Sequence, residues 1–69
     1  MQTIGDRIKL LRKEKGWTQK QLAEKLDCHK NLICYWEHMR CLPNVVMLID
    51  LSIIFGVTTD YILKGGKND

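Results

Sequence analysis

Two predicted helices separated by only three residues lie in the middle of the chain, over about residues 18–26 and 30–38. The first opens with Thr18, which has Gln21 three residues later, the spacing of a capping box at a helix start. Its apolar residues recur at the intervals of one helix face: Leu22, Ala23 and Leu26. The second helix turns two large apolar residues inward: Ile33 and Trp36. Helices joined so closely predict a helix-turn-helix, in which the small Ala23 lets the two helices cross at short range.

The remainder of the chain is also patterned as helices. Capping residues precede apolar runs of helical spacing, and glycines follow them, which predicts three further helices. They are expected over about 4–15, over about 44–55, and from Thr58 or Thr59 through Leu63. The sequence therefore predicts an all-α fold of five short helices, with a single helix-turn-helix domain over residues 1–66 and a frayed C-terminal tail over 67–69.

The length of the chain and its N-terminus limit what can stabilise it. A domain of 69 residues is marginal without a disulfide, a metal or a second subunit. The chain opens without an apolar signal segment, so the cytosol is the expected compartment, where the three cysteines would stay reduced. No apolar run approaches the length of about 18 residues that a membrane span needs, so no membrane partner is expected.

Positive charge is concentrated in the first part of the chain. Residues 1–40 hold nine Lys and Arg against five Asp and Glu, a net charge of +4. Residues 41–69 hold two against three, a net charge of −1, which gives +3 for the whole chain. Such an uneven distribution suggests a polyanionic partner on one side of the molecule.

The sequence resembles the lambda-repressor-like (XRE/Cro) helix-turn-helix family in four stretches: "IGDRIKLLRKEKGWTQKQLAEKL", "NLICYWE", "LPN" and "FGVTTDYIL". The matching positions share one register: Thr18, Gln19, Leu22, Ala23, Leu26, Ile33, Trp36 and Glu37. The resemblance implies a lambda-repressor-like DNA-binding domain with its helix-turn-helix at about 18–38. It also implies a prokaryotic or phage regulator that binds double-stranded DNA sequence-specifically, usually a repressor that binds an inverted-repeat operator as a homodimer. Arg12 and Glu37 occupy positions that form a charge pair in the family.

The chain departs from the family pattern at three places. Asp27 stands in the turn where the family usually has glycine, and aspartate adopts the left-handed conformation more readily than most residues. Cys34 and Tyr35 replace commoner polar residues, which leaves the base preference open. Met39 stands where glycine often follows the third helix, which predicts a less sharp helix exit.

A polar face is predicted on the helix over 30–38, opposite Ile33, since each residue turns the helix by about 100°. By family position, the residues expected to contact bases are Lys30, Asn31, Cys34 and Tyr35. The residues expected to contact phosphates lie at helix ends: Thr18, Gln19, His29, His38 and Arg40. Lysine suits guanine O6 and N7, and asparagine suits adenine N6 and N7, so this face is suited to the major groove.

All cysteines and histidines of the chain lie in "CHKNLICYWEHMRC", residues 28–41. Cys34 and His38 are four residues apart on one helix and can place two ligands on one ion. Cys28 aligns with an apolar core position, so a closed site of four ligands is not expected. A metal- or thiol-responsive regulator that uses Cys34, His38 and Cys41 is one alternative. The main interpretation includes no metal, cofactor or small-molecule ligand, and no catalytic set that would indicate an enzyme.

The predicted helix over 44–55 is apolar on more than one face. Its expected inward residues are Leu48, Leu51, Ile54 and Phe55. A neighbouring stripe contains Val46, Ile49 and Ile53. Either the core face is wide, or this stripe forms a homodimer surface together with Tyr61 and Ile62. An alternative function is a protein-interaction module of the same fold, of the antitoxin or anti-repressor type.

Overall fold

The computed structural model describes residues 2–66. It contains five α-helices: α1 (Ile4–Glu14), α2 (Gln19–Leu26), α3 (Lys30–Glu37), α4 (Val45–Phe55) and α5 (Thr59–Lys64). No strand occurs within these residues, so the predicted all-α, five-helix fold is confirmed. The predicted tail over 67–69 lies outside the described residues. No helix in the described part has the length and apolar character that a membrane span requires.

Side-chain caps fix where the helices begin. The Thr3 hydroxyl oxygen accepts a hydrogen bond from the Asp6 N–H at 3.0 Å, and the Asp6 carboxylate accepts one from the Thr3 N–H at 3.1 Å. Thr18 and Gln21 form the same reciprocal box at the start of α2, as the sequence predicts. The remaining helices also have capping side chains: His29 for α3, Asn44 for α4 and Thr58 for α5.

Helices α1 to α4 end in the same way: a residue at the C-cap or directly after it has a left-handed backbone, which lets a backbone N–H bond back to a carbonyl in the last turn of the helix. Gly16 and Gly56 supply it after α1 and α4 without steric cost. Asp27 and Met39 supply it on either side of α3, at φ angles of 55° and 57°. After α3 the closing hydrogen bond runs from the Arg40 N–H to the Tyr35 carbonyl, at 2.8 Å. The expected loose exit after α3 is therefore wrong, because Met39 itself adopts the conformation that glycine usually takes.

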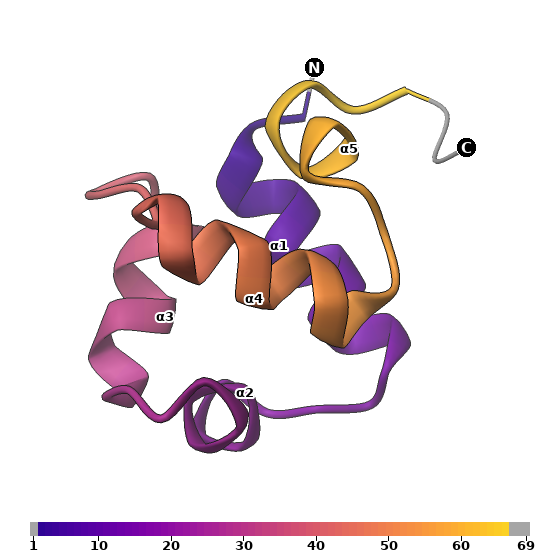
Figure 1. Cartoon of the computed structure of the whole chain (residues 1–69). Helices are drawn as coiled ribbons and strands as arrows, with labels where there is room; N and C mark the ends of the chain where they lie inside the picture. The colour runs from indigo at the N-terminus through magenta and orange to yellow at the C-terminus, as the bar shows by residue number, and fades with distance from the viewer. Residues whose placement is uncertain (1, 67–69) are drawn as a thin grey trace.

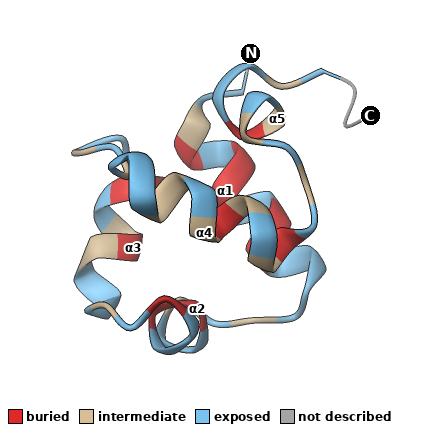
Figure 2. Cartoon of the chain, viewed as in Figure 1, coloured by how far each residue is buried: buried red, intermediate tan, exposed pale blue. Residues whose placement is uncertain are grey.

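Every helix contributes to one buried core. Figure 1 shows α4 lying across the molecule with α1 behind it, while α2 and α3 form the lower left side. The fully or nearly buried apolar residues, shown red in Figure 2 with the other buried residues, are Ile8, Leu11, Leu22, Ala23, Leu26, Ile33, Trp36, Leu51, Phe55 and Ile62. Leu48 and Ile54, expected to face inward, are only half-buried. Both nevertheless pack against the core, as the sequence predicts, together with the buried Leu51 and Phe55.

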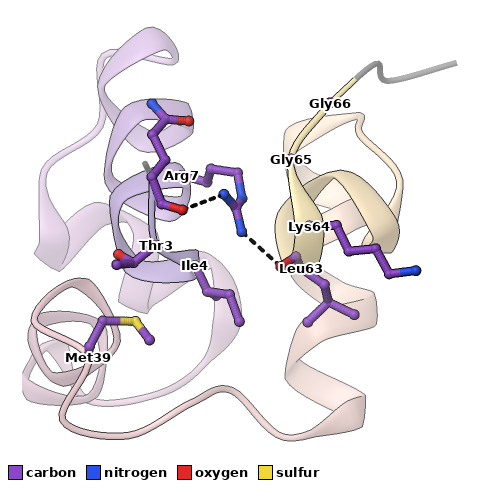
Figure 3. Close-up of a pocket in the computed structure, with 9 residues that line it drawn as sticks. Thr3, Ile4, Arg7, Met39, Leu63, Lys64, Gly65 and Gly66 are labelled. Atoms are coloured by element: carbon purple, nitrogen blue, oxygen red, sulfur yellow. Dashed lines mark hydrogen bonds between the residues drawn. The ribbon is translucent and has the colours of Figure 1, made fainter.

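A buried arginine joins the first helix to the last. The guanidinium of Arg7 donates to the carbonyl oxygens of Ile62 and Leu63, both at 2.8 Å, and to that of Gln2 at 2.9 Å. Figure 3 shows two of these bonds, with Arg7 reaching from α1 toward α5. Carbonyls at the C-terminal end of a helix lack helical partners and attract cations, so Arg7 acts as a cap for α5. The sequence does not predict this contact.

Candidate nucleic-acid interface

The exposed side of α3 carries the polar residues that the sequence places there. Ile33 and Trp36 are buried against the other helices, as expected. On the opposite side Lys30, Asn31 and Tyr35 are exposed, and Cys34 is half-buried. We call these four residues the α3 face. Its side chains combine hydrogen-bond donors and acceptors with apolar surface, which is the mixture that base edges in the major groove require.

A buried ion pair fixes α3 from behind. Arg12 Nε donates to one carboxylate oxygen of Glu37 at 2.7 Å, and Arg12 Nη2 donates to the other at 3.1 Å. Arg12 Nη1 donates to the Trp17 carbonyl at 2.7 Å, in the connection between α1 and α2. Since both side chains of the pair are almost completely buried, the bidentate contact sets the position of α3 relative to α1. This is the pair that the family resemblance implies.

The start of α2 is also tied to Glu37. The side-chain amide of Gln19 donates to a Glu37 carboxylate oxygen at 3.1 Å, a contact that the sequence does not predict. The capping box already uses the hydroxyl and the N–H of Thr18. The backbone N–H groups of Gln19 and Lys20 are therefore the donors that the capping box leaves at this helix start. Contacts from this end to a phosphate would come mainly from backbone groups that Thr18 and Gln19 hold in place.

Two histidines mark the ends of α3. His29 Nδ1 accepts a hydrogen bond from the Asn31 N–H at 3.1 Å, so the neutral ring carries its proton on Nε2. His38 Nδ1 lies 2.9 Å from the Cys34 carbonyl oxygen, which can only accept, so this nitrogen is the donor. Both side chains are exposed, as is Arg40. Each residue is thus placed at the surface where the sequence expects phosphate contacts.

The cysteines do not gather into a metal site. Cys34 Sγ lies 3.5 Å from His38 Nδ1, but no group of three His, Cys, Asp or Glu side chains within residues 2–66 is arranged to hold an ion. The three-ligand site with Cys41 that the sequence offers as an alternative is therefore not formed. Cys28 packs against the core, and burial, followed by the nearby Asp27 charge, raises the pKa of its thiol. A higher pKa keeps that sulfur in its neutral, less reactive form.

One side of α4 is apolar and exposed. Val46, Ile49 and Ile53 are exposed, and Ile53 retains 71 % of its accessible surface. Two further residues extend this surface toward the end of α3: Leu42 and Val45. We call these five residues the α4 patch. Tyr61 is half-buried, and Ile62 is wrong as a contact residue, because it is 0 % exposed and packs into the core.

Two short helices that cross closely, with the second bearing an exposed polar face, define a helix-turn-helix protein. A family model described as "Helix-turn-helix domain" matches residues 5–66. The chain belongs to this family, of the lambda-repressor-like type that its sequence resembles.

Known proteins of similar sequence and structure include transcriptional regulators. The chain is 37 % identical to the HTH-type transcriptional regulator ImmR of Bacillus subtilis, over 97 % of this chain and 51 % of ImmR. It therefore spans about half the length of that relative. A crystal structure of the P22 c2 repressor bound to a synthetic operator superposes with a TM-score of 0.91 at 32 % identity, covering 96 % of this chain and all of that one. SinR in complex with DNA gives a TM-score of 0.78 at 33 % identity, covering 87 % and 97 %.

Proposed function

We propose that the chain is a DNA-binding transcription regulator that inserts α3 into the major groove. The observation that carries this proposal is the α3 face, an exposed surface on a short helix that the Arg12–Glu37 ion pair fixes from behind. The P22 c2 repressor and SinR, which share the fold at more than 30 % identity, were each solved bound to DNA. ImmR is named as a transcriptional regulator, and we propose no catalytic activity for this chain.

Within the α3 face, each residue suits a different part of a base pair. The Lys30 ammonium donates to guanine O6 or N7, and the Asn31 amide pairs with adenine N6 and N7. Tyr35 and Cys34 offer apolar surface for a thymine methyl group, and Tyr35 also carries a hydroxyl that reaches a phosphate. In base recognition, Lys30 and Asn31 in the first turn of α3 therefore supply the hydrogen bonds, and Cys34 and Tyr35 in the second turn supply the apolar contact.

The residues around this face contact the sugar-phosphate backbone. His29 uses Nδ1 to cap α3, so its Nε2–H is the group offered to a phosphate. His38 and Arg40 serve the other end of the helix, and the start of α2 at Thr18 and Gln19 offers backbone N–H groups. Such contacts position the helix without selecting a sequence, and they make binding weaken as salt rises.

We further propose that the regulator is a repressor that binds an inverted repeat as a homodimer through the α4 patch. Burial of five exposed apolar residues against a second copy would add to a core that is small for an isolated domain. Two copies related by a two-fold axis would place their α3 helices in successive major grooves, about 34 Å apart.

Selection from a pool of random duplexes tests DNA recognition. Enrichment of an inverted repeat supports the proposed regulator. If the protein enriches no sequence and binds only in a salt-sensitive, nonspecific manner, the proposal fails. The α4 patch would then favour the second candidate, a protein-interaction module of the antitoxin or anti-repressor type.

Sedimentation of a charged variant tests the dimer. Ile49→Lys together with Ile53→Lys places two ammonium groups in the α4 patch and should yield monomers with weaker operator binding. Leu10→Lys changes an exposed leucine of α1 and serves as the matched control, which should sediment as the unmodified protein does. An unchanged dimer in the α4 variant would show that the copies associate through another surface.

A further inference from the structure

The side chain of Met39, which follows α3, contacts the first turn of α1. Met39 Sδ accepts a hydrogen bond from the Gly5 N–H at 3.3 Å. This N–H lies in the first turn of α1, where backbone donors have no partner within the helix. Beside it the two helices are in close contact, since a Cβ atom on Gly5 would lie 2.3 Å from the Trp36 carbonyl oxygen. The sulfur thus satisfies a backbone donor at a junction where α1 has no room to move toward α3.

Met39 is also accessible from solvent. It is 43 % exposed and lines a cavity of about 490 Å³ between the start of α1 and the end of α5, where Figure 3 shows its thioether at the edge. Among the described residues the other methionine, Met47, is half-buried against the core. Met39 therefore has both an accessible side chain and a structural contact that uses the sulfur lone pair.

We propose that Met39 is an oxidation-sensitive latch between α1 and α3, whose substrate is a small hydroperoxide. The sulfur attacks the terminal oxygen of the peroxide, the O–O bond breaks, and a new S–O bond forms. Sulfur is oxidised by two electrons to the sulfoxide, and the peroxide is reduced to an alcohol or to water, which receives the proton of the hydroperoxide. Methionine sulfoxide is polar and chiral, and reductases return it to the thioether.

Oxidation replaces the thioether sulfur that Gly5 uses with a larger, polar S–O group, which does not fit within the 3.3 Å between the sulfur and the Gly5 nitrogen. One sulfur lone pair then carries the oxygen atom, which would occupy the space of the N–H if it pointed toward α1. Since Gly5 already lies against the backbone of α3, the Met39 side chain must turn into the cavity instead. The closure after α3 that positions His38 and Arg40 then loses its tie to α1. Loss of this contact should lower the stability of the fold. It should also weaken DNA binding, and this second effect rests on the proposed function, in which His38 and Arg40 contact phosphates.

Peroxide treatment of the full chain tests the latch. The protein is exposed to hydrogen peroxide and then to excess dithiothreitol, which reverses sulfenic acids and disulfides at the cysteines but leaves methionine sulfoxide. Mass spectrometry of peptides locates the added oxygen. We expect Met39 to be oxidised before Met47, DNA affinity to fall roughly fivefold or more, and the melting temperature to fall by about 4 °C or more. Methionine sulfoxide reductase should restore both.

The variant Met39→Leu is the control, since it keeps the side-chain size and cannot accept the oxygen. Because leucine also lacks the sulfur that accepts from the Gly5 N–H, the treated variant is compared with its own untreated form. Peroxide should leave its affinity and melting temperature unchanged, whereas an equal loss in this variant would assign the effect to a residue other than Met39 and overturn the proposal. Unmodified affinity and melting in protein that carries Met39 sulfoxide would also overturn it. If the untreated protein binds no DNA sequence, the proposed function fails, while the melting comparison still decides whether the latch exists.

Discussion

At the scale of single residues, the position of α3 depends on groups that lie behind the α3 face. Glu37 holds Arg12 and Gln19, and the pair with Arg12 follows from the resemblance to the family. Gly5 allows α1 to approach the end of α3, and this role is not predicted. From the sequence alone, glycine at this position is only a residue of low helix propensity, and nothing local indicates a close contact with another helix. Its function becomes visible only when the facing carbonyls are known.

Replacing Gly5 by alanine should destabilise the protein. The added Cβ would meet the Trp36 and Glu37 carbonyl oxygens at 2.3 and 2.8 Å, and both belong to backbone that cannot turn away. We expect the free energy of unfolding to fall by about 1–3 kcal/mol, despite the higher helix propensity of alanine. Urea denaturation measures the change. Gly16→Ala provides a comparison, because no atom lies within 4 Å of its added Cβ and its cost comes only from the left-handed backbone at φ 75°, which the helical Gly5 does not have. A stabilised Gly5→Ala variant would contradict the close crossing.

The Arg12–Glu37 pair should show strong coupling in a double-mutant cycle. Glu37→Leu alone leaves the Arg12 guanidinium buried without its counter-ion, which should cost about 3–5 kcal/mol of unfolding free energy. Adding Arg12→Met removes the unpaired charge, so the double variant should be more stable than the Glu37→Leu single variant. Guanidinium denaturation of both single variants, Glu37→Leu and Arg12→Met, and of the double variant measures the coupling. Additive losses would mean that the two side chains do not act as a pair.

At the scale of helices, the sequence predicts starts better than it predicts closures and contacts. Thr3 and Thr18 cap through residues three positions away, so a local pattern contains the whole interaction. Glycine usually occupies the left-handed position after a helix, so the sequence does not predict that Met39 adopts this conformation and ends α3 sharply. The cap that Arg7 provides for α5 joins residues 55 and 56 positions apart, which no local pattern contains.

The first capping box should make stability depend on acid pH. The hydrogen bond from the Thr3 backbone N–H is the largest cause that holds the pKa of Asp6 below its ordinary value of 3.8. A carboxyl group with a lowered pKa in the folded state stabilises the protein above pH 3.8, and this contribution is lost as the pH falls through the lower folded value. The stability difference between the unmodified protein and Asp6→Asn should therefore shrink below pH 3.8. Thermal unfolding over a pH series checks this, and a difference that grows in acid would contradict the box.

At the scale of the whole molecule, the arrangement of five helices could be predicted, but the surfaces could not be fully assigned. Helix α4 is apolar almost all round, so periodicity cannot tell which of its faces is buried. Leu48 and Ile54 pack against the core as expected but are only half-buried, while Val45 belongs to the exposed patch. The error at Ile62 has the same origin, because α5 is too short for its pattern to separate core from surface. Tertiary packing decided these residues, and packing is not contained in local spacing.

The central claim, that the α3 face reads bases, is tested most directly by measuring affinity for a selected operator and all its single-base variants. Lys30→Ala should lose about 1–3 kcal/mol of discrimination at one base pair in each half-site and keep its preferences elsewhere. Lys64→Ala, which removes an exposed lysine from α5, should leave the pattern unchanged. Equal weakening of Lys30→Ala on every sequence would contradict the claim, since Lys30 would then contact only phosphate.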